Sequence, residues 1–376
     1  MNERYFDHHS TQSPSETARR VLAESIERFG DPLRLHERGR GAHRALEDAR
    51  EQVAAALGAQ PEEIVFTSGG TESVTLALHG TAPSAGERLV TGAVEHPSVL
   101  AAAAVAASAG AEVATAPVDE HGRIDVDRFA EEVRKPGTRV ASVQHANHEV
   151  GTMQPVSEAA SLAREAGALL HCDACQTVGK LPVDVGGLGV DLLSLSGHKF
   201  GGLPGVGALY VRRGVRLAGP AGGDDRERRR RSGLQNVAAI LATGAALADA
   251  LGSVGDTAAA RWLLTARLRK GIDEAIPAAR THGHPTQRTP HLVCFSVEDV
   301  DPEVLSMSLD QRGFRLDAGS VVTGSPHEPS PVLAAMGLPG RVAFRASVGP
   351  GTKEEDVDAL LDALSDLVAA LRRMAT

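Results

Sequence analysis

Residues 191–202 read DLLSLSGHKFGG and combine a buried strand with a reactive side chain. The run Asp191–Leu195 predicts a strand, and Lys199 follows it among small and polar residues. Burial of a lysine is costly unless the amine is paired or functional, and a lysine amine can form a Schiff base with an aldehyde cofactor. Lys199 is therefore a candidate catalytic residue, and a solvated loop lysine is the alternative.

Short β-type runs alternate with helical patterns on both sides of this strand. Such alternation predicts right-handed βαβ crossovers and an α/β fold, with a mostly parallel sheet covered on both faces. Val206–Val211 is a candidate antiparallel hairpin partner. The other predicted strands are Ile64–Thr67, Arg88–Thr91, Arg139–Val143 and Ala168–His171, and the predicted helices are Arg44–Ala56, Glu72–Leu78, Pro97–Ser108, Val126–Val133 and Val156–Ala166.

The pattern changes after the Ala-rich helical stretch Val237–Leu251 and predicts a smaller α+β domain. With a boundary near Gly252–Asp256, we expect residues 12–252 to form the large domain. Residues 1–11 and 253–376 would form the small one. Its predicted elements are the helices Thr257–Ile272, Pro302–Gln311 and Glu354–Met374 and the strands His291–Ser296 and Val342–Ser347.

Polar motifs follow four other predicted strands, at the sheet edge where parallel sheets bind ligands. Thr67–Glu72 places two glycines and a hydroxyl at a helix N-terminus, which suits an anion. Asp173 ends an apolar strand and needs a cationic partner, for which a protonated pyridine nitrogen would serve. Glu95-His96 and Asn147–Glu149 complete the set. Each alone has a structural explanation, but their convergence predicts one active-site cleft.

Composition narrows the class of protein. The 376 residues are 42% hydrophobic and 23% charged, which is typical of a globular protein. The net charge of −9 and the 3% of aromatic residues argue against a nucleic-acid partner. No apolar stretch approaches the roughly 20 residues of a membrane span, and no secretory signal is visible. Three cysteines indicate a reduced, cytoplasmic protein, and no Cys/His spacing completes a metal site.

Together these motifs resemble the cysteine desulfurase family, which has the class V aminotransferase fold (fold type I) of enzymes that depend on pyridoxal 5′-phosphate (PLP). The similarity runs from Tyr5 to about Thr352. It implies a large domain with a seven-stranded sheet, a smaller α+β domain, and a homodimer with active sites at the subunit interface. Its most specific segments are Thr67–Glu72, Glu95-His96, Asn147–Pro155, His171–Lys180, Ser194–Lys199, Arg231–Gly233 and Gly319–Leu333.

The resemblance also implies roles for single residues. Lys199 would hold PLP through an imine, and Asp173 would pair with its ring nitrogen. His96 would stack on the ring and help proton transfer. The other implied cofactor contacts are Gln176 at the ring hydroxyl, Asn147, and Gly70, Thr71, Ser196 and His198 at the phosphate. The implied substrate contacts are Asn147 and Arg345 at the carboxylate, and His9.

Several positions depart from the family's pattern. Desulfurases carry a nucleophilic cysteine on a loop that reads roughly Gly-Ser-Ala-Cys, and here the corresponding residue is Val322. Valine cannot attack sulfur or hold a persulfide, and we do not expect Cys172, Cys175 or Cys294 to replace the missing thiol. The other departures are Leu234 for a phosphate-binding threonine, Val74 and Thr75 for paired asparagines, His9 and Ser10 for small residues, and Gly201-Gly202 for an aromatic.

These features predict a PLP-dependent lyase or transferase that cleaves the C–S or C–Se bond of cysteine, or of a cysteine-like amino acid, without a loop persulfide. Leaving groups that depart unaided fit this chemistry, such as sulfite, selenium or the thiol of a cysteine conjugate. A PLP-dependent aminotransferase or epimerase acting on another amino acid is one alternative. A silent scaffold for a sulfur-transfer system is another, suggested by Leu234 and the Arg228–Arg231 run. The expected partners include a sulfur-acceptor protein, but no membrane.

Overall fold

The strand that precedes Lys199 is β7 (Leu192–Ser196), which lies inside a seven-stranded sheet. In this computed structural model the strand order is β2-β8-β7-β6-β5-β3-β4. The pairs from β7 to β4 are parallel, whereas β8 is antiparallel to both β7 and β2. The predicted sheet and its antiparallel partner are confirmed. The remaining strands are β2 (Ile64–Thr67), β3 (Arg88–Gly92), β4 (Glu112–Ala116), β5 (Thr138–Ser142), β6 (Leu169–Asp173) and β8 (Gly207–Val211).

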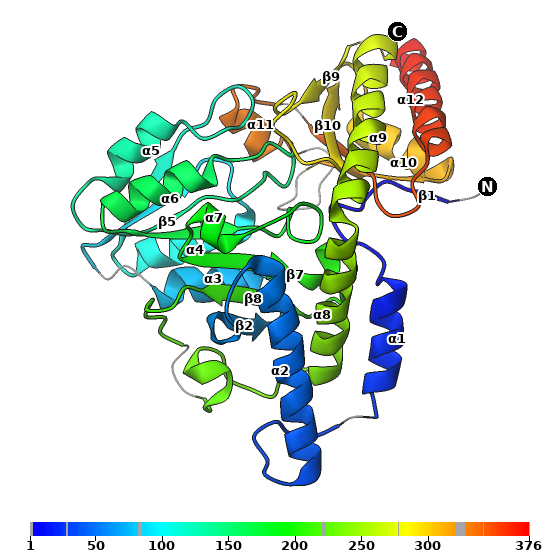
Figure 1. Cartoon of the computed structure of the whole chain (residues 1–376). Coiled ribbons are helices and arrows are strands. Elements are labelled where there is room, and N and C mark those ends of the chain that lie inside the picture. The colour runs from blue at the N-terminus through cyan, green and yellow to red at the C-terminus, as the bar shows by residue number, and fades with distance from the viewer. Residues whose placement is uncertain are drawn as a thin grey trace.

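The structure describes residues 3–27, 29–81, 85–219, 223–276, 278–319, 328–340 and 342–375. Helices cover both faces of the sheet (Figure 1), as buried parallel strands require. One face packs on α2, α5, α6 and α8, and the other packs on α3 and α4. The helices of this part are α1 (Glu16–Ser25), α2 (Glu37–Leu57), α3 (Gly70–Gly80), α4 (Pro97–Ser108), α5 (Val126–Val133), α6 (Val156–Glu165), α7 (Val185–Leu188) and α8 (Val237–Gly252).

A second, antiparallel sheet has the order β12-β13-β10-β9 and its own apolar core. Helices α9, α10 and α12 pack beside it, as Figure 1 shows. The predicted α+β character of this part is therefore confirmed. Its elements are β1 (Arg4–Tyr5), α9 (Val254–Ala275), β9 (Ala279–His282), β10 (Leu292–Val297), α10 (Pro302–Gln311), β11 (Phe314–Arg315), β12 (Asp317–Ala318), α11 (Pro331–Ala335), β13 (Phe344–Ser347) and α12 (Glu354–Ala375).

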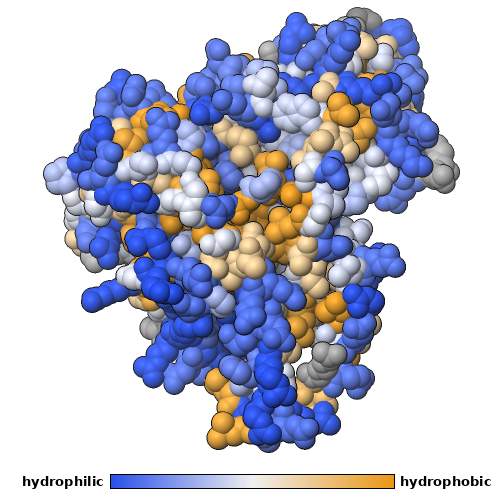
Figure 2. All heavy atoms as spheres, in the orientation of Figure 1, coloured by the Kyte–Doolittle hydropathy of each residue, from blue (hydrophilic) through white to orange (hydrophobic). Residues whose placement is uncertain are grey.

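The two parts meet at the break between α8 and α9, where Ser253 separates the helices. This break falls inside the predicted boundary, although the domain limits themselves stay a prediction. Of the helices in the described ranges, none alone has the length and apolar character of a membrane span. Helices α8 and α9 pass that test only as a pair, which is bent by 72°. In Figure 2 the rim of the visible face is mainly hydrophilic, and apolar residues gather near its middle.

Candidate active site

A cavity of about 520 Å³ opens at the carboxyl ends of the strands of the large sheet. This size suits a cofactor or small ligand. Its wall brings together side chains from the β2–α3 turn, from the ends of β6 and β7, and from the N-terminal segment. The predicted site residues on this wall are His9, Gly70, Thr71, His96, Asp173, Gln176, Ser196, His198 and Lys199.

The β2–α3 turn forms the anion end of the cavity. Helix α3 begins at Gly70 with no side chain capping its N-terminus, so its first amide groups are available to an anion. A Cβ on Gly70 would lie 2.6 Å from the Sγ atom of Cys175, so a side chain there would force the thiol of Cys175 to move. Ser196 and His198 line the same cavity. This glycine cradle fits a phosphate group.

Lys199 lies at the end of the short helix η2 (Gly197–Lys199), directly after β7. Its Nζ atom donates a hydrogen bond to the backbone oxygen of His9 at 2.8 Å. Burial lowers the pKa of the amine, although the charge of Asp173 opposes this shift. A lowered pKa increases the fraction of free amine, which is the form that adds to an aldehyde.

Asp173 ends β6, the strand next to β7, and pairs in register with Ser194. Its Oδ1 atom accepts the amide of Cys175 at 3.0 Å, and the side chain lines the cavity. The neighbouring Glu95 is fully buried, and burial holds its pKa well above the ordinary value. Asp173 thus places an acidic side chain on the cavity wall. A bound pyridine nitrogen would need such a partner.

His96 caps the N-terminus of α4, and its ring faces the cavity. The Nδ1 atom accepts the amide of Ser98 at 3.1 Å, which assigns the proton of the neutral ring to Nε2. Burial lowers the pKa of His96. The ring of His148 packs edge-on at 5.1 Å between centroids. The neutral ring of His96 can therefore hold a proton on Nε2 inside the cavity.

Gln176 is held by two buried neighbours. Its Oε1 atom lies 3.1 Å from the Nζ atom of Lys180 and 3.3 Å from Nε2 of His291, and its Nε2 donates to the backbone oxygen of His9. Burial lowers the pKa of Lys180 well below its usual range, and the charge of Lys199 adds to this shift. Sequence reasoning missed this support, because Lys180 is only one polar residue in an ordinary turn.

Two predicted substrate contacts are not on the cavity wall. Asn147 is fully buried, and both ends of its side-chain amide bond to the backbone. Its Nδ2 atom donates to Val94, and its Oδ1 accepts from the amides of Glu149 and Val150. Arg345 is also fully buried, behind Asp317. Their substrate roles, and the cofactor role of Asn147, stay predictions.

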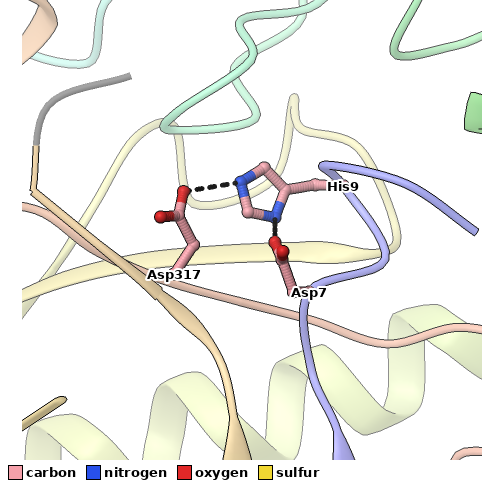
Figure 3. A group of neighbouring side chains, drawn as sticks. All are labelled: Asp7, His9 and Asp317. Carbon is pink, nitrogen blue, oxygen red and sulfur yellow. Dashed lines mark ion pairs between the residues drawn. The ribbon is translucent and has the colours of Figure 1, made fainter. Parts of the chain in front are cut away.

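The N-terminal segment contributes His9, shown in Figure 3 between two carboxylates. Its Nδ1 atom lies 3.2 Å from Asp7, and its Nε2 atom lies 3.3 Å from Asp317. Ligand atoms of these three residues lie within 4.8 Å of one another, as a metal site would require. However, the carboxylates approach opposite ring nitrogens, and Asp317 already pairs with Arg345. Burial lowers the pKa of His9, so a histidine ring hydrogen-bonded to a carboxylate describes this group better than a metal centre.

The departures from the family's pattern lie in different surroundings. Val74 is fully buried in the core, and Leu234 is 61% exposed. Arg231 donates to Glu72 on the cavity wall at 3.1 Å. Val322 lies outside the described residues, so its predicted place on the catalytic loop stays a prediction.

The thiols of the three cysteines are held in protonated form. Cys172 and Cys294 are fully buried within strands. Cys175 reaches the cavity beside Asp173. Burial holds its pKa well above the ordinary value, and the charge of Asp173 adds to this effect. Because the thiolate is the nucleophile, Cys175 is poorly suited to attack sulfur.

Comparison with known proteins defines the class of enzyme. Residues 4–360 match the family described as aminotransferase class-V. A solved NifS-like protein has a TM-score of 0.91 at 30% identity, covering 98% of this chain and 100% of that chain. The solved SspA in complex with cysteine has a TM-score of 0.80 at 28% identity, covering 92% and 99%. The fold and the cavity are those of a PLP-dependent class V enzyme.

Curated relatives narrow the assignment. Cysteine desulfurase IscS of Methanosarcina thermophila is 37% identical over 377 residues, covering 98% of this chain and 93% of the relative. Cysteine desulfurase NifS of Azotobacter vinelandii is 36% identical over 381 residues, covering 100% and 94%. The chain belongs to the cysteine desulfurase family, and the resemblance is confirmed.

Proposed function

We propose that this chain is a PLP-dependent lyase that cleaves the C–S or C–Se bond of cysteine, or of a cysteine-like amino acid, without forming a persulfide on the loop after Gly319. One observation carries the proposal. The cavity joins an amine, an acidic group and a glycine cradle, whereas every described thiol is buried or has a raised pKa. Val322 at the predicted nucleophile position supports the same conclusion.

The residues present fit PLP. Gly70, Thr71, Ser196 and His198 would hold its phosphate, Asp173 its ring nitrogen and Lys199 its aldehyde carbon. When bound, PLP supplies an electron sink for charge that develops on the substrate's α-carbon.

The chain's own groups then move protons. The Nζ atom of Lys199, whose pKa is lowered, can accept a proton from the substrate. The neutral ring of His96 carries a hydrogen on Nε2, with which it can donate a hydrogen bond to a group in the cavity. Without a thiolate to attack the substrate's sulfur, the leaving group must depart unaided, as sulfite, selenide or a conjugated thiol can.

Spectroscopy and product analysis test the proposal. The purified protein with PLP should show a visible absorption band, and Lys199→Ala should remove it. Lys135 is an exposed lysine that pairs with Glu132, so the control variant Lys135→Ala should keep the band. Incubation with cysteine, cysteine sulfinate and S-substituted cysteines should release a product from at least one. No turnover of any of them would refute the lyase.

The same assays separate the alternatives. A keto acid that retains the substrate's whole side chain would identify an aminotransferase, because elimination of the thiol leaves only pyruvate. Exchange of the α-hydrogen for deuterium without C–S cleavage would identify an epimerase. Dimerisation without any catalysis would identify a scaffold. New sulfide release from cysteine by Val322→Cys would show that the remaining machinery is competent and would count against the scaffold.

We also propose a homodimer with the active site at its interface. Exposed apolar side chains support the homodimer, because contiguous apolar patches on a protein surface mark interaction sites. They are Ile26, Phe29, Leu33, Leu35 and Leu234. Light scattering should give twice the monomer mass, and a monomer would refute the dimer. The family likeness also supports a sulfur-acceptor protein as a partner, testable by transfer of released sulfur to a candidate acceptor.

A further inference from the structure

A second cavity of about 570 Å³ lies outside the active site, where the large and small parts of the chain meet. Its wall comes from the start of α1, from both sides of the break between α8 and α9, and from the turn that precedes α12. Figure 1 shows α1 running beside α8 below this break. Within the described part of the chain, the two cavities have no lining residue in common. The function proposed above therefore does not account for the second cavity.

Arg261 on α9 places a buried charge on the wall of the second cavity. The residue is only 9% exposed. Its Nη1 atom is buried and has no hydrogen-bond partner among the described residues, and no described carboxylate offsets the effect of burial, which lowers the pKa of the guanidinium. An arginine nevertheless stays protonated at neutral pH. Because charged side chains are almost never buried to this extent without a partner, Arg261 indicates an anionic ligand.

The buried groups around Arg261 are basic. The charge of Arg261 acts on His8, Lys180 and His291, where it adds to the effect of burial and lowers the pKa of each. His8 lines the second cavity, and its pKa of about 4 leaves the ring neutral at pH 7. A bound anion would therefore relieve the repulsion within this group.

The rest of the wall limits the kind of anion. Phe200, Ala246 and Leu264 give the second cavity an apolar lining. The acidic residues on the wall are Glu16 and Asp249, and both are exposed. Two such charges would repel a dianion more strongly than a monoanion. An apolar lining with one buried guanidinium suits a ligand that carries a single negative charge on an apolar body.

We propose that the second cavity binds a small organic monocarboxylate, with the carboxylate on Arg261 and the apolar body against Phe200, Ala246 and Leu264. A guanidinium matches the planar geometry of a carboxylate. The volume of the cavity suits a ligand of this size. The inference does not depend on the proposed lyase activity, because it uses none of the residues of the active site.

Matched pairs of ligands test this inference. The PLP-loaded protein is titrated by calorimetry with benzoate and with butyrate, and each is compared with its neutral amide, benzamide or butyramide. We expect the carboxylates to bind more tightly than the amides. Arg261→Gln should weaken carboxylate binding by about tenfold or more, because a hydrogen bond to a charged group is stronger than one to a neutral group. If neither carboxylate binds, or if the amides bind as tightly, the inference is overturned.

Two further variants separate the site from the fold. Arg267→Gln is the control, because Arg267 lies on the same helix but is exposed and pairs with Asp358, and it should leave binding unchanged. Ala250→Leu keeps Arg261 but narrows the second cavity, so it should weaken carboxylate binding as well. If Arg261→Gln does not fold, Ala250→Leu decides, and unchanged binding in that variant overturns the inference.

The remaining outcomes also bear on the site. Equal effects of Arg261→Gln and Arg267→Gln would overturn it, because the effect would not depend on the buried charge. Tighter binding of inorganic phosphate than of benzoate and butyrate would overturn the monocarboxylate. Because Arg261 loses no described partner, Arg261→Gln should unfold at the same temperature as the wild type or higher when no ligand is added. A clearly lower unfolding temperature would make Arg261 a structural residue and count against the site.

Discussion

Glu227→Gln should destabilise the protein by about 3 kcal/mol. The side chain of Glu227 is 0% exposed and forms a two-pronged ion pair with Arg50, at 2.7 and 3.0 Å. It also accepts the amide of Phe66 at 2.9 Å, at the end of the strand that leads into the glycine cradle. Burial alone would raise the pKa of Glu227, but the bonds and charge of Arg50 hold it below the ordinary value.

The magnitude follows from what remains around Arg50. Loss of one partner of a buried ion pair costs about 3–5 kcal/mol, because the other charge is left without compensation. Glu47 still lies 3.1 Å from Arg50, which places the expected loss at the lower end of that range. Glu227 and Arg228 have left-handed backbones, with φ of 47° and 55°. Such a conformation costs on the order of 1–2 kcal/mol per residue, so the buried pair also maintains this turn.

Urea denaturation followed by circular dichroism measures the effect. Asp225→Asn is the matched control, since Asp225 pairs with Arg229 in the same turn but both side chains are largely exposed. We expect the control to leave the unfolding midpoint unchanged. A loss below about 1 kcal/mol for Glu227→Gln, or equal effects of the two variants, would refute the reasoning.

Other perturbations test the cavity. Gly70→Ala adds a methyl group within 2.6 Å of the thiol of Cys175. We expect the affinity for PLP, measured by spectral titration, to fall about tenfold with the fold intact. Unchanged affinity would argue against the glycine cradle as the phosphate site. Cys175→Ser should retain C–S cleavage in the product assay, and an inactive but PLP-loaded variant would make Cys175 a nucleophile. In the folded protein the pKa of Asp317 is lowered from its ordinary 3.8 to about 2. Its contribution to the free energy of unfolding is therefore present above about pH 4 and is lost as the pH falls toward 2. Asp317→Asn should flatten this part of the curve of unfolding free energy against pH, and curves of equal slope would contradict it.

The elements that sequence predicted well are those with a complete apolar pattern. Strands β5 and β7 are buried over most of their length, and α10 was predicted to the residue. Strand β4 was missed, because it lies at the sheet edge and only one of its five residues is buried. Helix α1 was missed for a similar reason, with only Ala18 and Ser25 buried. Elements with few buried residues leave little apolar periodicity for a sequence to display.

The cofactor side of the site could be predicted, because each group directly follows a strand of one parallel sheet. Lys199 and Asp173 illustrate this, since their strands are neighbours and their ends coincide. The position of Arg345 could not be predicted, because it depends on Asp317, in another strand, and on His9, near the other end of the chain. Nothing in local spacing indicates that three such distant residues meet. The only signals were an unusual histidine and an acidic residue two positions before a glycine.

The cofactor side and the substrate side of the cavity come from different parts of the fold, and this affects how the site can change. The cofactor groups come from the large sheet and its turns, so their positions are tied to a core that tolerates little change. The substrate end is built from the N-terminal segment and two strands of the small sheet, which meet the cavity through side chains such as His9 and Asp317. A substitution there alters the charge that meets the substrate without disturbing the glycine cradle. A spectral titration should therefore give the same PLP affinity for Asp317→Asn as for the wild type, and that separation lets the substrate end change while the cofactor site is kept.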